Sequence, residues 1–300
     1  MWGGTNVQRS VRSIQASLDA GVNFIDTAPA YGLGLSERVV GEAIRGRRDK
    51  VILATKCGLV WHTTKGRFFA DQNGSSIHRY LGAESIRYEV EQSLRRLETD
   101  YVDLYLTHWQ DPTTAIRETM STLLDLKKEG KIRAIGVSNC TVDQLRQYRS
   151  VGPVDAAQEN YSMLHRELQR EYLPYCTRNN IAVLAYSPLG NGLLTGKVGP
   201  DRIFPEDDLR RHNPMFSRES RVRVREMLDR MEPVAREYSL TEGQLAIAWT
   251  LAQPGITHVL VGARDAVQSA ENAAAGGVLL AAADAQRVTE MVQASALVEA

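Results

Sequence analysis

The sequence predicts a single α/β domain over residues 1–300, in which parallel strands close into a (β/α)8-type barrel. Short apolar runs alternate with amphipathic helical segments and no break in composition divides them, which is typical of right-handed strand–helix–strand units. Three of the runs also end in a polar residue, namely Asp26, Lys56 and His108. The carboxyl ends of parallel barrel strands lie on one rim, where active sites form. We therefore expect these three side chains to meet.

Seven strands are expected, and they end near residues 26, 56, 107, 137, 159, 186 and 261. A barrel of this class has eight strands. A helical pattern is already present at residues 11–20, and the glycine-rich residues 1–5 are too short for a confident strand. We expect the first barrel strand to be missing or reduced to a stub.

Helical periodicity fills the intervals between the strands. Gly21 is expected to end the first helix, Ser36 to cap the second, and Asp111 and Pro112 to be the cap and first residue of a later one. Thr141 with Gln144, and Thr241 with Gln244, have the spacing of capping boxes. The expected helices cover 11–20, 36–44, 84–97, 113–129, 168–179, 245–251, 266–275 and 283–297, and a further helix is expected to follow the capping box at Thr141.

Two polar segments interrupt this pattern. Residues 57–82 are expected to be irregular, and are either a loop that covers the site or a surface insertion. Residues 187–220 are rich in glycine, proline and charge. Both segments would shape the substrate pocket, so the sequence leaves the substrate open.

Composition excludes several classes of function. The 36 basic and 36 acidic residues balance, so no basic stripe favours nucleic acid. The three cysteines have no zinc-binding or disulfide spacing, and no metal site is expected. The start lacks the features of a signal peptide and no apolar run is long enough to span a membrane, so a cytoplasmic protein without membrane partners is expected.

The polar residues at the strand ends suit proton transfer to a carbonyl oxygen. Free tyrosine has a pKa of about 10, so a tyrosine such as Tyr31 needs a nearby cation to become a useful acid. Lys56 would supply that cation, Asp26 would hold it, and His108 would bind the substrate oxygen. Hydride must come from a cofactor, since no side chain donates it. The same residues could instead form a structural ion pair, a loop anchor and a core histidine.

The chain resembles the aldo-keto reductases, and within them a bacterial branch similar to the potassium-channel β-subunits. The resemblance is carried, in order, by DTAPAYGLGLSE, ATK, THW, KIRAIGVSN, AYSPLGNGLLTGK and VGARDAVQSAEN. It implies that Tyr31 is the general acid, that Lys56 and Asp26 tune it, and that His108 orients the carbonyl. It also places Trp109 in the substrate pocket, where Trp61 is expected to face it.

The resemblance further implies a nicotinamide cofactor that lies across the barrel rim. The residues for its carboxamide and ring would be Ser138, Asn139, Gln158 and Tyr186. Those for its pyrophosphate would be Ser187, Leu189, Gly192, Thr195 and Lys197, and those for its adenosine end Gly262, Arg264, Gln268, Glu271 and Asn272. The cation of Arg264 suits a 2′-phosphate, which favours NADPH/NADP+ over NADH.

The family pattern includes an N-terminal hairpin and a first barrel strand before the segment MWGG, and this chain begins at that segment. Their loss would expose strand edges through which an oligomer could form. The expected activity is NADPH-dependent reduction of a small aldehyde or ketone to an alcohol. The alternatives are a cofactor-binding regulatory subunit with slow turnover, and a truncated chain with impaired cofactor binding.

Overall fold

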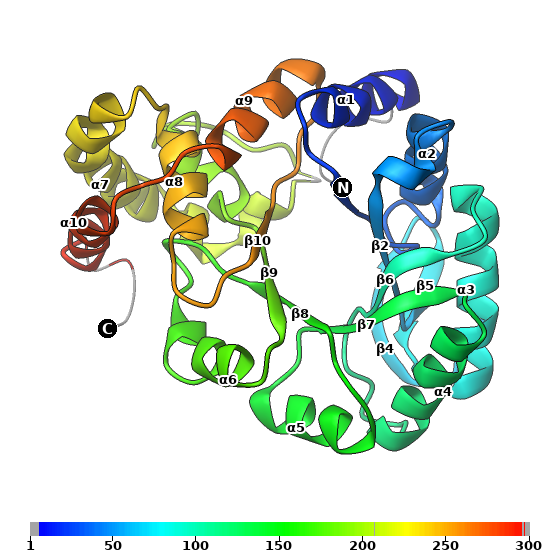
Figure 1. The fold of residues 1–300 in the computed structure, drawn as a ribbon. Helices are drawn as coiled ribbons and strands as arrows, with labels where there is room; N and C mark the ends of the chain where they lie inside the picture. Colours follow the sequence, from blue (N-terminus) through cyan, green and yellow to red (C-terminus); the bar gives the residue numbers. More distant parts are fainter. Residues whose placement is uncertain (1–5, 207, 296, 298–300) are drawn as a thin grey trace.

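The computed structural model describes residues 6–206, 208–295 and 297. Their central feature is a seven-stranded parallel sheet that curls into a barrel, with helices around the outside (Figure 1). Its strand order is β1-β2-β6-β7-β8-β9-β10. These strands are β1 (Phe24–Asp26), β2 (Ile52–Cys57), β6 (Val102–Thr107), β7 (Ile132–Ser138), β8 (Ala156–Asn160), β9 (Ala182–Tyr186) and β10 (His258–Leu260). The seven predicted strands are thereby confirmed.

Helices follow the strands in alternation, as predicted. They are α1 (Val7–Asp19), α2 (Leu35–Ile44), α3 (Ala83–Leu97), α4 (Ile116–Lys128), α5 (Val142–Val151), α6 (Tyr172–Arg178), α7 (Arg218–Glu237), α8 (Glu242–Leu251), α9 (Ala266–Gly276) and α10 (Ala282–Gln293). Short 3-10 turns are η1 (Arg48–Lys50), η2 (Glu167–Gln169), η3 (Gly190–Thr195), η4 (Leu209–His212) and η5 (Pro214–Phe216). None of the described helices is long and apolar enough to cross a membrane.

Side chains of each strand alternate between the barrel interior and the helical layer. On β6, Leu104 and Leu106 belong to a small interior cluster, whereas Tyr105 between them packs in the larger cluster beneath the helices. This alternation follows from the two-residue period of a strand. The apolar runs that predicted the strands therefore fill both layers of the core.

The barrel is nearly closed between β1 and β10, the two end strands of the described sheet. The rings of Phe24 on β1 and His258 on β10 lie 5.3 Å apart. Outside them, α1 packs against α9, where the Ser13 and Ser269 hydroxyls lie 2.9 Å apart (Figure 1). Side-chain and helix contacts thus join the end strands. Residues 1–5, considered above for a stub of a strand, lie outside the described residues.

Local capping signals had mixed outcomes. Both capping boxes, at Thr141 and at Thr241, are confirmed. Gly21 follows α1 with φ +90°, as a glycine at a helix end should. Ser36 does not cap α2, because it lies inside the helix and bonds the Thr27 hydroxyl (2.8 Å). Asp111 does not begin α4 either.

The Asp111 carboxylate is instead bound to a neighbouring loop. It accepts a hydrogen bond from the backbone N–H of Leu81 at 3.0 Å and from the Thr114 hydroxyl at 2.6 Å, and α4 begins only at Ile116. This tertiary role outweighs the capping preference of aspartate. The segment that begins with Asp111 and Pro112 is therefore a turn that ties α4 to the start of α3.

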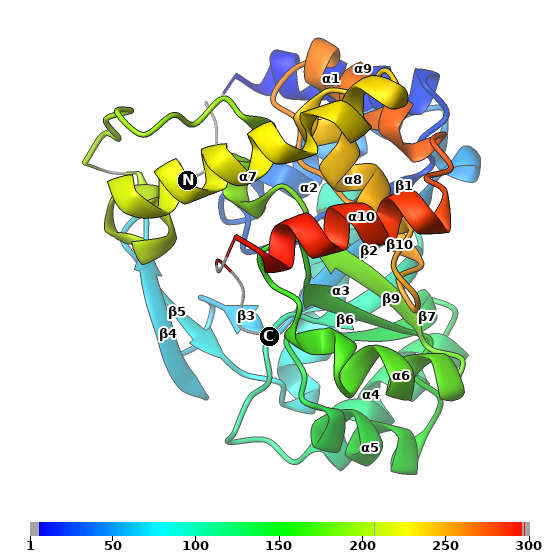
Figure 2. The ribbon, with the colours of Figure 1, turned by 90° about the vertical axis from the view of Figure 1, so that its left-hand side faces the viewer.

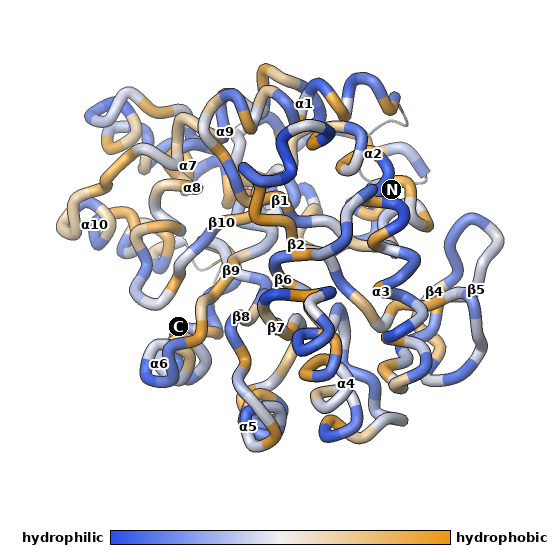
Figure 3. Tube along the Cα trace, turned by 45° about the vertical axis from the view of Figure 1, so that its right-hand side comes forward, coloured by the Kyte–Doolittle hydropathy of each residue, from blue (hydrophilic) through white to orange (hydrophobic). Residues whose placement is uncertain are grey.

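Residues 57–82 are largely ordered as antiparallel strands, so the prediction of an irregular loop is wrong. The strands β3 (Leu59–Val60), β4 (Arg67–Gln72) and β5 (Ser75–Arg79) form a small sheet. Asn73 and Gly74 join β4 to β5 with φ of +48° and +77°, the conformation that an Asn-Gly hairpin turn requires. Figure 3 shows this hairpin standing away from the barrel.

Helix boundaries in the C-terminal half also differ from expectation. The segment 168–179 is split between η2 and α6, and α10 ends at Gln293 rather than at 297. The longest helix, α7, was not predicted. It packs against α10 beside the barrel, and it contains Pro233, which obscures its helical pattern in the sequence (Figure 2).

Candidate active site

The four predicted catalytic residues lie together at the carboxyl end of the barrel. Asp26 ends β1, Lys56 lies near the end of β2, and His108 directly follows β6. The Lys56 Nζ donates to the Asp26 carboxylate at 2.7 Å and to the Thr27 carbonyl at 2.9 Å. It also lies 5.2 Å from the centre of the Tyr31 ring. Parallel pairing of β1, β2 and β6 brings these strand ends into one place.

Tyr31 is the accessible member of this group. Its side chain is 44% exposed, whereas Lys56 is fully buried and His108 is 8% exposed. The rings of Tyr31 and His108 meet edge to face with centres 5.5 Å apart. A small molecule that reaches the phenol therefore also meets the imidazole.

The environment keeps Lys56 charged and His108 neutral. Burial alone would lower the pKa of Lys56, but the nearby Asp26 and Tyr31 outweigh it, and the pKa is raised. Burial and the positive charge of Lys56 hold the pKa of His108 well below its usual range. At neutral pH, His108 is an uncharged imidazole beside an ammonium.

Three of the residues predicted to hold the nicotinamide carboxamide belong to one hydrogen-bond network with the catalytic group. The Gln158 amide donates to Asp26 at 2.8 Å, and the Ser138 hydroxyl donates to the Gln158 carbonyl at 2.8 Å. The Asn139 amide donates to the His108 carbonyl at 2.8 Å. The ends of β7 and β8 are thus fixed relative to the end of β6.

Tyr186, predicted to stack under the nicotinamide ring, joins the same network. Its hydroxyl donates to the Asn139 side-chain oxygen at 2.7 Å. Burial raises the pKa of Tyr186 to about 12, so this phenol remains protonated and can donate. Its half-buried ring lies at the end of β9, where an aromatic face is available to a flat ligand.

A buried carboxylate supports this region from the helix side. Glu159 follows Gln158 on β8 and faces outward, where it accepts from the Cys140 N–H and the Tyr172 hydroxyl, both at 2.9 Å. Burial raises the pKa of Glu159 to about 7. The sequence reasoning missed this residue, although the alternation of a strand places it opposite Gln158.

The predicted pyrophosphate and adenosine segments are brought side by side. They follow β9 and β10, which pair directly, with Tyr186 opposite Leu260. The Lys197 Nζ lies 3.7 Å from the Glu271 carboxylate, which links the two segments. In the first segment Ser187, Asn191 and Gly192 have positive φ, and Thr195 donates to the Gly192 carbonyl at 2.7 Å.

The second segment presents open backbone and an exposed cation. An added Cβ at Gly262 would meet nothing within 4 Å, so a ligand can approach its backbone. Arg264 is exposed, and its N–H donates to the Gln268 side chain at 3.1 Å. The Asn272 amide donates to the Gly262 carbonyl at 3.3 Å. This combination of open glycine and positive charge fits an elongated anionic group.

Two tryptophans lie beside the loop that carries Tyr31. Trp109 and Trp61 both pack on the cluster of Ala30, Leu59 and Ile77, next to the Tyr31 loop. Trp109 also lines a pocket of about 260 Å³ on the rim. Trp249 is fully buried in the core beneath α8.

The cysteines near the site are unsuited to nucleophilic chemistry. Cys57 and Cys140 are buried and free, and burial raises the pKa of each thiol. Each thiol therefore stays protonated at neutral pH. Neither cysteine therefore offers a nucleophile beside the four predicted catalytic residues.

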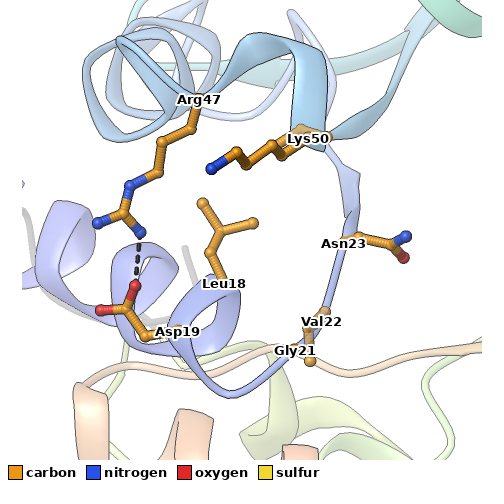
Figure 4. A pocket seen from close by; sticks show the side chains of 8 residues that line it. Leu18, Asp19, Gly21, Val22, Asn23, Arg47 and Lys50 are labelled. Carbon is orange, nitrogen blue, oxygen red and sulfur yellow. Dashed lines mark hydrogen bonds and ion pairs between the residues drawn. The ribbon is translucent and has the colours of Figure 1, made fainter.

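A larger pocket of about 500 Å³ lies at the other end of the strands. It is lined by residues that precede β1 and β2, among them Asn23 and Lys50, and by Asp19 and Arg47, which form an ion pair at 2.6 Å (Figure 4). None of the predicted site residues lines it. Two of the predicted site residues, Trp109 and Asn139, line the smaller pocket instead.

Sequence reasoning also missed two arginines of the rim pocket, Arg67 and Arg79. They lie on β4 and β5, in the segment that was expected to be irregular. The Asn-Gly pair at 73–74 was the available signal, because it predicts a hairpin and hence a fixed position for both arginines.

Comparison with known proteins agrees with this geometry. The sequence model of the Aldo/keto reductase family matches residues 1–293. The aldo-keto reductase YhdN of Bacillus subtilis (strain 168) is 42% identical over 267 residues, which cover 88% of this chain and 77% of that protein. The NADH-specific methylglyoxal reductase of Escherichia coli (strain K12) is 41% identical over 298 residues, or 98% and 90% of the two chains. The chain belongs to the aldo/keto reductase family and is an oxidoreductase.

Solved structures of this family share the fold. The glycerol dehydrogenase AKR11B4 from Gluconobacter oxydans superposes with a TM-score of 0.90 at 36% identity, over 99% of this chain and 88% of that one. An aldo/keto reductase from Klebsiella pneumoniae, solved with NADP and acetate, gives a TM-score of 0.72 at 28% identity, over 95% and 86%. These matches confirm the predicted (β/α)8 class.

Proposed function

We propose that this protein reduces a small aldehyde or ketone to an alcohol with NADPH, and that Tyr31 is the general acid. The observation that carries the proposal is the group formed by buried Lys56, Asp26 at 2.7 Å and the exposed Tyr31 ring at 5.2 Å. An ammonium beside a phenol stabilises the phenolate that remains after proton transfer. The bound nicotinamide supplies the hydride, which no side chain can donate.

Each catalytic residue has a distinct part in the proton transfer. Tyr31 gives its phenolic proton to the oxygen of the reduced carbonyl, and Lys56 faces the charge that remains on the phenol. Asp26 holds the ammonium in place and keeps the pKa of Lys56 raised. His108, neutral because burial and Lys56 lower its pKa, orients the carbonyl oxygen by a hydrogen bond without competing for the proton.

The residues at the rim fit the proposed cofactor. Ser138, Asn139 and Gln158 would hold the carboxamide, and the Tyr186 ring would lie against the nicotinamide. The pyrophosphate would meet residues 187–197, where positive-φ backbone and the ammonium of Lys197 can contact anionic oxygens. The adenosine end would lie along residues 262–272.

The choice of NADPH rests on Arg264. Its guanidinium is exposed beside the open backbone of Gly262 and suits a 2′-phosphate. The relatives point to both nicotinamide forms, since one is named for NADH and another was solved with NADP. We place the reaction in the reducing cytoplasm, in which the three buried, unpaired cysteines would stay as thiols.

Fluorescence titration of the purified chain with NADPH and NADH tests the cofactor assignment. We expect saturable binding of both, with NADPH preferred, and oxidation of bound NADPH on addition of an aldehyde such as 4-nitrobenzaldehyde. Folded protein that binds neither nucleotide, or that binds NADPH yet reduces none of a panel of aldehydes and ketones, would overturn the proposal.

A further inference from the structure

The rim pocket beside the catalytic group carries positive charge that the mechanism above does not use. Its lining residues are Arg67, Arg79, Trp109, Gln110, Pro112, Asn139 and Gln144. Two of them adjoin His108, since Trp109 follows it in the chain and the Asn139 amide bonds its carbonyl at 2.8 Å. The pocket lining has two cations and no acidic residue, and it lies next to the place where the carbonyl is reduced.

The two arginines face each other without a counterion. Arg67 on β4 and Arg79 on β5 are directly paired across the antiparallel ladder, and like charges in such a pair are destabilising. Among the ion pairs of the described residues, neither guanidinium has a carboxylate partner. The Arg79 Nε is buried with no hydrogen-bond partner, which is costly for a charged donor.

The hairpin that carries the arginines is fastened to the active-site loop. The Gln72 amide on β4 donates to the carbonyl of Ala30, the residue before Tyr31, at 3.2 Å. The Phe69 ring lies 5.6 Å from that of Trp109. Gly66 approaches Arg79 so closely that an added Cβ would lie 2.1 Å from the Arg79 carbonyl oxygen. The guanidiniums are therefore placed with respect to Tyr31 and His108.

Figure 2 shows that the β4–β5 hairpin projects beyond the same end of the barrel as the segment between η3 and α7. The residues proposed for the pyrophosphate and the adenosine end of the cofactor lie after β9 and β10, whereas the arginines lie after β2. The phosphates of the cofactor are thus assigned to a different part of the rim. The guanidiniums of Arg67 and Arg79 are therefore free to bind a group of the substrate.

We propose that the preferred substrate is a carbonyl compound that also bears an anionic oxygen group, a carboxylate or a phosphate, which accepts hydrogen bonds from Arg67 and Arg79. The inference rests on the proposed carbonyl reduction and adds the class of substrate. The anion supplies the acceptor that the Arg79 Nε lacks and relieves the repulsion between the two guanidiniums. Trp109 and Pro112 form the apolar wall beside it.

Matched substrates test this proposal. We would measure kcat/KM for 4-carboxybenzaldehyde against methyl 4-formylbenzoate, and for glyceraldehyde 3-phosphate against glyceraldehyde. In at least one pair we expect the anionic member to be preferred by roughly 10- to 100-fold, the range of one charged hydrogen bond. A larger ratio for the benzaldehyde pair would indicate a carboxylate substrate, and a larger ratio for the glyceraldehyde pair would indicate a phosphate.

The variants Arg79→Gln and Arg67→Gln should each lower that ratio at least several-fold. The fall should come from a lower kcat/KM for the anionic substrate, while kcat/KM for the neutral substrate stays unchanged. Arg67 is exposed, so its variant should fold even where the other does not. Lys65→Gln is the control, because it removes the same charge from the same segment without lining the pocket. Equal rates for anionic and neutral substrates, or ratios unchanged in both arginine variants, would overturn the inference.

A binding measurement separates this inference from the proposed function. Calorimetry should show that benzoate binds the NADP+-loaded protein more tightly than benzamide does. Arg67→Gln should weaken the binding of benzoate and leave the binding of benzamide unchanged. Benzoate binding without reduction of any carbonyl would support the arginine site and reject the reductase. Reduction of neutral carbonyl compounds, with no preference for benzoate over benzamide in binding, would support the reductase and reject the arginine site.

Discussion

Replacement of Lys56 by methionine is the sharpest perturbation of the catalytic group. The side chain keeps its approximate length and apolar stem, but the bonds to Asp26 at 2.7 Å and to Thr27 at 2.9 Å are lost. Removal of one partner from a buried ion pair costs about 3–5 kcal/mol. Asp26 is 15% exposed and keeps the hydrogen bond from the Gln158 amide at 2.8 Å, so we expect a loss of stability of about 3 kcal/mol.

The effect on catalysis should be larger than the effect on folding. Without the ammonium, the phenolate that forms when Tyr31 gives up its proton has no adjacent cation. We expect kcat to fall about 10²- to 10⁴-fold, the usual contribution of general acid catalysis. NADPH affinity should change little, because Lys56 is fully buried and is not among the residues proposed to hold the cofactor.

The assays are urea denaturation for stability and aldehyde-dependent oxidation of NADPH for rate. Lys50→Met is the matched control, since Lys50 is exposed at the opposite end of the strands and lines the other pocket. It should leave both quantities unchanged. A Lys56→Met protein with the stability and kcat of the wild type would refute the assigned role of the pair.

Three further predictions concern pH, cofactor choice and packing. Burial raises the pKa of Glu89 from 4.5 to about 8, so its stabilising contribution is complete below pH 4.5 and is lost as pH rises through 8. Urea titrations between these values should show Glu89 lowering stability by up to about 1.4 kcal/mol per pH unit. Glu89→Gln should remove this share, and Glu159, whose pKa burial raises to about 7, should retain a similar slope up to that pH. Arg264→Ala should weaken NADPH binding about tenfold with little change for NADH, as a fluorescence titration would show; equal losses for both would exclude a 2′-phosphate contact. Trp249→Ala should lower the free energy of unfolding by about 3–5 kcal/mol, because a fully buried indole and its bond to Thr289 at 3.0 Å are lost. A smaller loss in calorimetry would mean that α8 is loosely packed.

The parts of the fold that the sequence predicted are those with strong local signals. Most of the barrel strands are apolar runs bounded by turn residues, and the two capping boxes begin α5 and α8 as expected. The catalytic group was predicted for a related reason. Parallel strands bring their carboxyl ends together whatever loops connect them, so Asp26, Lys56 and His108 had to converge.

The parts that were missed depend on tertiary contacts. Ser36 and Asp111 were expected to cap helices, but each has a partner from another element, Thr27 and Leu81 respectively. The hairpin after β2 was read as irregular, because the bulge between Phe68 and Ala70 interrupts its alternation. As a result, the arginines of the rim pocket were not recognised. Their cross-strand pairing exists only once the Asn-Gly turn has formed.

The role of Tyr31 is tested most directly by following the hydrogen that the reaction transfers. NADPH deuterated at the reactive carbon of the nicotinamide should place deuterium on the carbinol carbon of the alcohol, as seen by NMR, with the wild-type protein. Tyr31→Phe should bind NADPH as the wild type does and form this product at least about 100-fold more slowly. Labelled product at an unchanged rate from Tyr31→Phe, or alcohol without deuterium from the wild type, would contradict the account.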